Sequence, residues 1–104
     1  MAKVDGGIAS SIERFLAAVR LRKRVESAYL YGSYPSGRAT EWSDIDLALI
    51  SPDFSTDLFA ERLALMRLAA DIDDRIEPWP FRPEDFNEND PLANEIQKSG
   101  VSVQ

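Results

Sequence analysis

The chain has 104 residues, of which 44% are hydrophobic and 29% charged, a balance that suits one globular domain and argues against disorder. It has no cysteine and no histidine, which excludes disulfide frameworks, thiolate nucleophiles, imidazole bases and zinc sites built on these ligands. Its formal charge of −6 argues against a large nucleic-acid interface, because such affinity comes from neutralising phosphates. Chemistry must therefore rest on carboxylates, hydroxyls, basic side chains and backbone amides, and carboxylates favour hard cations.

We expect residues 1–104 to form a single domain, since no linker or repeat interrupts the pattern. The charge is uneven: residues 1–50 hold seven basic and six acidic side chains, and residues 51–104 hold five basic and twelve acidic ones. No apolar run approaches the ~20 residues of a membrane span. Residues 1–7 lack the apolar core of a secretion signal. The expectation is a soluble, cytoplasmic protein.

A first helix is predicted from Ile8, because apolar residues recur from there at intervals of three and four as far as Val19. It should end near the basic run 20–24 (Arg-Leu-Arg-Lys-Arg), whose cations suit the negative end of a helix dipole. The alternative is that this run forms a patch facing a partner or a phosphate.

Two strands should frame one loop. Residues 25–31 are β-branched and aromatic and stop at Gly32, which predicts a first strand. Residues 32–43 contain two Gly, one Pro and four Ser or Thr residues, the composition of a loop. Residues 45–50 are apolar almost throughout, as expected of a central strand covered on both faces, and Ser-Pro-Asp at 51–53 ends it.

A second helix should begin after one of the N-cap residues at 55–57. The stretch that follows carries two adjacent apolar stripes at helical spacing: Phe59, Leu63, Met66 and Ala70 in one, and Leu58, Leu65, Ala69 and Ile72 in the other. This pattern predicts a largely buried helix.

The remaining elements are short. Residues 75–79 predict a third strand closed by Pro78 and Pro80. An Asp, a first-turn Pro and a terminal Gly at 90–100 predict a last helix. Together the elements predict an α/β fold, a small mixed β-sheet with helices packed mainly on one face.

Asp44 and Asp46 are the first candidate functional residues. On a strand their side chains leave the same face, with Cα atoms ~7 Å apart. Two carboxylates on an otherwise apolar strand repel each other and resist desolvation, so they require a cation or hydrogen-bond donors. A metal ion would supply that compensation. The alternative is that both lie at the mouth of the strand with nothing bound.

The loop before them begins with Gly32 and Ser33. Glycine lets a ligand approach the bare backbone, and such turns form concave sites for phosphate oxygens. Phosphate donors and metal carboxylates would then face each other across one cleft, although a plain turn is the alternative. Gly32 and Gly37 have Walker A spacing, but Arg38-Ala39 replaces Lys-Ser/Thr and an acidic strand follows where a helix is required, which excludes that motif.

Tyr31-Gly32-Ser33, ten further residues and then Asp44-Ile45-Asp46-Leu47 resemble the signature of the nucleotidyltransferases related to DNA polymerase beta. That signature is an apolar residue, Gly, Gly or Ser, a spacer, and Asp-apolar-Asp/Glu-apolar. The run 32–47 looks most like the minimal nucleotidyltransferases, small proteins often encoded beside a helical HEPN partner. The resemblance covers mainly residues 25–50 and implies a polymerase beta palm-like fold.

The resemblance also implies roles. Gly32 and Ser33 would hold the triphosphate of ATP or another NTP, and Asp44 and Asp46 would bind its Mg²⁺ or Mn²⁺. A third carboxylate belongs on a nearby strand, and Glu77 is our candidate because it is the acid embedded in a strand-like run. The family more often has Asp at that position, and Glu reaches one methylene further.

Five other residues have two interpretations each. Asp73 and Asp74 are fallback ligands for the metal ion or surface charges at a helix end. Arg38 would steady the phosphates or lie on the loop surface. Tyr34 or Trp42 would stack on the base or pack against the protein.

The resemblance implies a magnesium-dependent nucleotidyltransferase with Asp44, Asp46 and Glu77 as catalytic residues. It suggests transfer of AMP from ATP to a hydroxyl of a HEPN-type partner, with this chain as the antitoxin of a toxin-antitoxin pair. The alternative is a non-catalytic nucleotide- or partner-binding module that keeps the fold. Glu77 within metal reach of the two aspartates favours the enzyme, and Glu77 pointing away favours the module.

Overall fold

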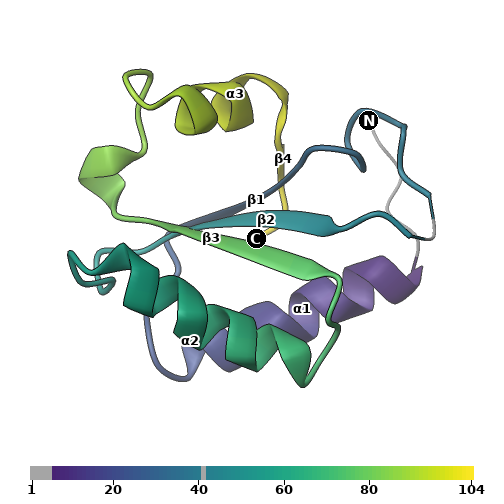
Figure 1. Ribbon diagram of the computed structural model, residues 1–104, viewed down its shortest axis with the longest axis horizontal. Helices are drawn as coiled ribbons and strands as arrows, with labels where there is room; N and C mark the ends of the chain where they lie inside the picture. The colour runs from purple at the N-terminus through teal and green to yellow at the C-terminus, as the bar shows by residue number, and fades with distance from the viewer. Residues whose placement is uncertain (1–5, 41) are drawn as a thin grey trace.

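The structure is a computed structural model and describes residues 6–40 and 42–104. Within them a four-stranded sheet has the order β3-β2-β1-β4 (Figure 1). β1 (Ser27–Tyr31) pairs antiparallel with β2 (Ile45–Ile50) and with the short β4 (Val101–Ser102). β2 pairs parallel with β3 (Ile76–Phe81). This mixed sheet confirms the predicted α/β class.

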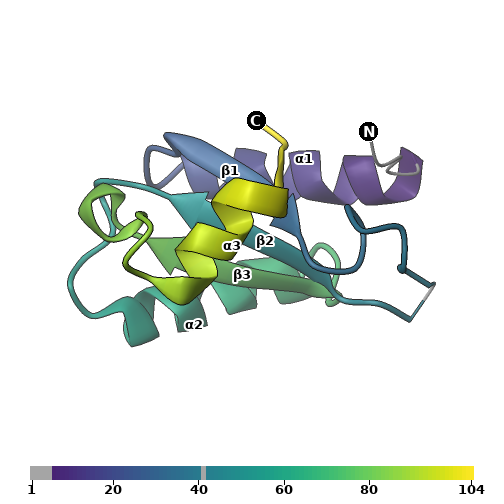
Figure 2. The same ribbon diagram turned by 90° about the horizontal axis from the view of Figure 1, so that it is seen from above.

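The helices lie on both faces of the sheet. α1 (Gly6–Arg20) and α2 (Leu58–Ala70) cover one face, and α3 (Pro91–Ser99) crosses the other (Figure 2). Side chains of β2 alternate between these two layers: Leu47 and Leu49 pack in the core under α1 and α2, while Ala48 and Ile50 pack in the core on the α3 side. β2 is therefore covered on both faces, as its apolar sequence predicts, and Asp46 is the polar exception.

The first helix buries the apolar face that the sequence predicts. Its apolar residues at intervals of three and four are all buried in the core: Ile8, Ile12, Phe15, Leu16 and Val19.

The expectation about a secretion signal concerned residues 1–7, of which 1–5 lie outside the described residues. No helix in the described part of the chain is long and apolar enough to span a bilayer.

α2 begins as predicted, because the Asp57 side chain accepts a hydrogen bond of 3.1 Å from the Ala60 amide. The prediction of a largely buried helix is wrong. Leu65 and Ala69 are buried against the sheet, whereas the other stripe is exposed: Phe59, Leu63 and Met66. Periodicity makes the two stripes equivalent, and only packing on the sheet decides which one is covered.

β3 was predicted to end at Pro78 and Pro80, but it continues through both prolines to Phe81. The Arg75 carbonyl accepts from Ile45 at 2.8 Å and the Phe81 carbonyl accepts from Ser51 at 3.0 Å, so the odd-numbered residues turn their backbone groups toward β2. Pro78 and Pro80 turn theirs to the free edge of the sheet, where a missing N–H breaks no ladder hydrogen bond.

The C-terminal elements differ little from expectation. Asp90 caps α3 by accepting from the Leu92 and Ala93 amides at 2.9 and 3.0 Å, and Gly100 follows the helix. β4 has two residues and was not predicted, since its length is below what alternation can reveal. β1 begins at Ser27, two residues later than predicted.

Candidate active site

Three neighbouring strands meet at one end of the sheet, at the right of Figure 1. The register sets Tyr31, the last residue of β1, opposite Asp46, and sets Asp46 beside Glu77 on β3. Gly32 directly follows Tyr31. The fold thus brings together residues from three separate segments, Gly32, Asp46 and Glu77, of which the sequence motif specified only the first two.

Gly32 lies against the Asp46 carboxylate. Its φ is +78°, in the left-handed region, and a Cβ at this position would overlap Asp46 Oδ2 and lie 3.4 Å from Asp46 Cγ. Glycine is therefore required here both for its backbone angle and for space. We predicted close approach to a phosphate at this position, and the structure adds close approach to the carboxylate.

The loop after Gly32 is closed by its own backbone. The Ser33 carbonyl accepts from the Arg38 amide and from the Ser36 hydroxyl, each at 3.0 Å. The exposed Arg38 side chain folds back, with Nε 3.2 Å from Ser36 Oγ. Among the described residues the Ser33 hydroxyl has no hydrogen-bond partner, so it is available to a ligand at this end of the sheet.

The two aromatic residues of the loop differ in their surroundings. Tyr34 packs against the core under α1 and α2, which favours its packing interpretation. Trp42 is 84% exposed, so it does not pack. Just before Asp44, the Ser43 hydroxyl accepts from the Thr40 amide at 2.9 Å, and this small turn leads the chain into β2.

The two aspartates of the motif differ in burial. Asp44 is exposed and precedes β2, while Asp46 lies on β2 and is partly buried. Burial raises the pKa of Asp46 above its ordinary value, and the charges of Asp44 and Glu77 raise it further. The carboxylates thus repel one another, as the sequence predicts. Their oxygen donors suit a hard cation such as Mg²⁺ or Mn²⁺.

Glu77 shares this end of the sheet but is held by a cation of the protein. Arg62 of α2 places Nη2 3.5 Å from Glu77 Oε2, donates from Nε to the Pro78 carbonyl at 3.2 Å, and stacks its guanidinium on the Trp79 ring at 3.8 Å. Within residues 6–40 and 42–104, no three acidic side chains are already gathered around one metal position. A role of Glu77 as third ligand therefore stays a prediction.

Sequence reasoning missed Arg62 and Tyr31. Arg62 reaches Glu77 around the free edge of β3, a contact that depends on how α2 packs. Burial raises the pKa of Tyr31, and the charge of Asp46 on the opposite strand adds to the shift while Arg62 opposes it. The position of Tyr31 immediately before the Gly-Ser pair was the available signal for a residue beside the cleft.

Asp73, a fallback ligand, has a structural role. Its carboxylate accepts from Arg75 Nη2 and from the Ser11 hydroxyl, both at 2.8 Å. The hydrogen bonds from Arg75 outweigh partial burial and hold the pKa of Asp73 well below its usual range. This carboxylate therefore ties α1 to the start of β3. Asp74 is exposed.

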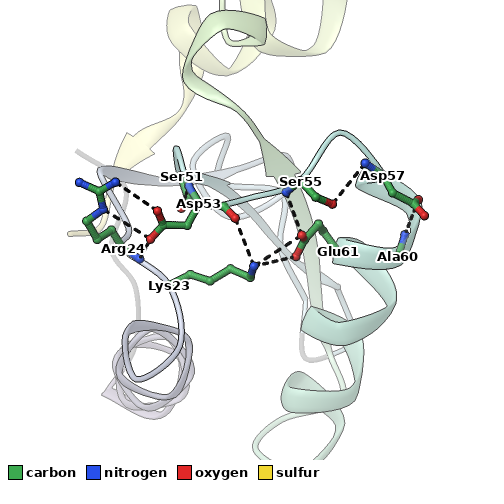
Figure 3. Close-up of polar contacts among 8 residues, drawn as sticks. All are labelled: Lys23, Arg24, Ser51, Asp53, Ser55, Asp57, Ala60 and Glu61. Atoms are coloured by element: carbon green, nitrogen blue, oxygen red, sulfur yellow. Dashed lines mark hydrogen bonds and ion pairs between the residues drawn. The ribbon is translucent and has the colours of Figure 1, made fainter.

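Part of the basic run is also structural. Lys23 Nζ lies 3.3 Å from Glu61 Oε1, and Arg24 Nη2 lies 3.1 Å from Asp53 Oδ1 (Figure 3). Hydrogen bonds from Arg24 lower the pKa of Asp53. For Glu61 burial acts in the opposite direction, yet hydrogen bonds from Ser55 and Lys23 lower its pKa. These pairs join the segment after α1 to the first turn of α2, through Glu61, and to the segment before it, through Asp53.

Residues 12–103 match the model of the nucleotidyltransferase domain family, so the chain belongs to that family. A crystal structure from Sulfolobus solfataricus, provisionally assigned as a nucleotidyltransferase, is 20% identical and superposes with a TM-score of 0.53. The match covers 98% of this chain and 89% of that one, and at this identity it shows the fold alone. A comparison with curated proteins found no match. Family and fold confirm the resemblance, and with it a general function in nucleotidyl transfer.

Proposed function

We propose that this nucleotidyltransferase uses ATP and Mg²⁺ to transfer AMP to a hydroxyl of a partner protein. The oxygen of the acceptor would form a bond to the α-phosphorus, the bond to pyrophosphate would break, and the hydroxyl proton would be released. The observation that supports this most directly is the meeting of Gly32, Asp46 and Glu77 at the ends of three neighbouring strands.

The residues divide into two groups in this proposal. Asp44 and Asp46, with Glu77 as the third ligand, would hold Mg²⁺ or Mn²⁺, since their mutual repulsion is what a cation relieves. Gly32, Ser33 and Arg38 would bind the triphosphate through backbone amides, a hydroxyl and a guanidinium. A divalent cation in such a site neutralises charge on the phosphate oxygens during transfer.

We further propose that the acceptor is a HEPN-type helical protein, with this chain as the antitoxin of the pair and the cytoplasm as its compartment. The support is the similarity of the run from Gly32 to Asp46 to the minimal nucleotidyltransferases. ATP is chosen over other nucleotides on the same ground.

One observation favours a second candidate, a module that binds nucleotide or partner without turnover. Glu77 is already paired with Arg62, so its carboxylate must leave that guanidinium, or share it, in order to bind a cation. In this candidate Asp44 and Asp46 alone would hold the cation that accompanies a bound nucleotide.

Incubation of the purified chain with Mg²⁺, a lysate of its native cells and ATP labelled on the α-phosphate tests the proposal. We expect a labelled protein band with α-labelled ATP and none with γ-labelled ATP, which separates transfer of AMP from phosphorylation. Asp44→Asn and Glu77→Gln should each lower labelling by about 100-fold or more. Glu88→Gln, which neutralises an exposed acid in the segment between β3 and α3, is the matched control.

The outcomes separate the candidates. Labelling that requires Asp44 and Glu77 supports the enzyme. Nucleotide binding without labelling, unchanged by Glu77→Gln, supports the binding module. Neither binding nor labelling contradicts both.

A further inference from the structure

An apolar groove lies beside the second half of β3, and Arg62, which pairs with Glu77, is part of its lining. It has a volume of about 530 Å³ and runs between the start of α2, the end of β3 and the start of α3. Its apolar wall includes Phe59, Trp79, Phe81 and Leu92. Phe59 is 75% exposed, an unusual state for a phenylalanine at a helical position. The groove is continuous with the exposed stripe of α2.

The other wall of the groove is acidic. Asp85 and Asp90 line it, and the segment 83–90 contains four acidic residues and no Lys or Arg. Asp90 uses Oδ1 to cap α3, and its Oδ2 has no hydrogen bond within the described part of the chain. Arg62, the cation in the lining, is already engaged by Glu77 and Trp79. The groove therefore suits an apolar side chain flanked by cations.

The chain itself carries such a feature. Leu21, just after α1, is 88% exposed, the highest value among the large apolar residues, and it stands between Arg20 and Arg22. In the described part of the chain neither arginine side chain has an ion pair or hydrogen bond, in contrast to Lys23 and Arg24. Arg20, Leu21 and Arg22, the RLR segment below, thus project an apolar side chain flanked by two cations.

We propose that the groove binds the RLR segment of a second copy of this chain. Leu21 would enter between Phe59 and Trp79, and the two arginines would face Asp85 and Asp90. The two arginines match the two aspartates in number and sign, and within one copy Asp85 has no ion pair in the described part of the chain while Asp90 serves as the cap of α3. The RLR segment and the start of α2 lie near each other, where Lys23 pairs with Glu61.

Two physical points shape the expected association. Sheet extension along β3 is disfavoured, because Pro78 and Pro80 present no N–H at that edge, so side-chain docking is the route that remains there. Two copies of formal charge −6 repel at long range, and moderate salt screens this more than it weakens a close ion pair. Association should therefore be weak, with a Kd on the order of 100 μM, and strongest at moderate ionic strength.

Sedimentation equilibrium of the full chain from ~5 to ~500 μM tests the proposal. At about 0.1 M NaCl we expect a monomer–dimer equilibrium, and at about 1 M a Kd at least threefold higher. Leu21→Asp and Phe59→Asp should each raise the Kd about tenfold or more. Trp42→Asp, which adds the same charge at an equally exposed aromatic residue elsewhere, should leave it unchanged. Circular dichroism verifies that each variant is folded.

A mixing experiment identifies the contact itself. Leu21→Asp keeps an intact groove and Phe59→Asp keeps an intact RLR segment, so an equimolar mixture should associate about tenfold more tightly than either variant alone. A chain that stays monomeric at ~500 μM overturns the proposal. So does association that survives both substitutions, or a mixture that is no better than its components. Arg22→Glu gives a further variant and should also weaken association, since this exposed side chain has no ion pair or hydrogen bond to the described residues.

Discussion

Two regions of the molecule differ in how the charges of their carboxylates are compensated. Beyond the end of β2, Asp53 and Glu61 each have a cation within 3.3 Å, and their pKa values are lowered. At the start of β2, Asp46 has no cation of its own among the described residues, and burial and two neighbouring acids raise its pKa. A paired carboxylate holds segments together, whereas a carboxylate without such a partner raises the energy of the folded chain until a ligand arrives.

The difference lies in the partners and not in the residue types. All of these acids occur in a chain with eighteen acidic and twelve basic side chains, so the excess of acids must fall somewhere. The fold places part of it at the start of β2, where Asp46 lies against Gly32. Neutralising a paired carboxylate should therefore lower the stability of the chain, and neutralising an unpaired one should raise it. The predictions below run from the largest expected effect to the smallest.

Gly32→Val should have the largest effect. It places a branched side chain at positive φ and drives it into the Asp46 carboxylate, which we expect to destabilise the chain by about 3 kcal/mol and to abolish nucleotide binding. Gly37→Val is the matched control, because Gly37 has φ +76° but nothing within 4 Å of its Cβ position. Thermal unfolding and nucleotide titration measure both. Equal loss of binding in the two variants would mean that backbone strain alone matters.

Asp73→Asn should lower the free energy of unfolding by about 2 kcal/mol at neutral pH, because it removes the charged acceptor of Arg75 and Ser11. The pKa of Asp73 is lowered in the folded chain, so its stabilisation is present above the unfolded value near 3.8 and is lost as the pH falls through the folded pKa. Urea unfolding at several pH values should show the two proteins converge in acid. A constant difference at all pH values would contradict the electrostatic assignment.

Asp46→Asn should act in the opposite direction. The pKa of Asp46 is raised in the folded chain, so its ionised form costs stability, and that cost grows as the pH rises from about 3.8 through the folded value. Without divalent ions we expect the variant to melt a few degrees higher than the wild type at neutral pH. With Mg²⁺ or Mn²⁺ present the wild type should gain stability and the variant should not. A variant that is less stable in the absence of cations refutes the repulsion argument.

Arg62→Gln should have the smallest effect on stability, below about 1 kcal/mol, because the ion pair with Glu77 is partly exposed. Its effect on cation binding is more informative. Removing the competing guanidinium should raise the affinity for Mn²⁺, which calorimetry measures directly. Arg67→Gln, on the same helix and exposed, is the control. A lower Mn²⁺ affinity in Arg62→Gln would show that Arg62 orients Glu77 instead of competing for it.

The parts of this molecule that sequence reasoning predicted are local in the chain. The strand at 45–50 has its predicted bounds, and the neighbourhood of Gly32 and Asp46 follows from one loop between two paired strands. The contact of Arg62 with Glu77 was not predictable, since it joins residues fifteen positions apart through the packing of a helix on a sheet edge. The exposed stripe of α2 was missed for the same reason.

Gly32 and Asp46 form one mechanical unit. The Asp46 carboxylate occupies the space that a Cβ of residue 32 would take, so a shift of the turn toward β2 requires the carboxylate to move. In the proposed reaction the cation would position the carboxylate and the triphosphate would position the turn, so the binding of one ligand should affect the binding of the other. Any free energy of coupling between these proposed ligands is reciprocal: the factor by which Mg²⁺ would change the affinity for ATP equals the factor by which ATP would change the affinity for Mg²⁺.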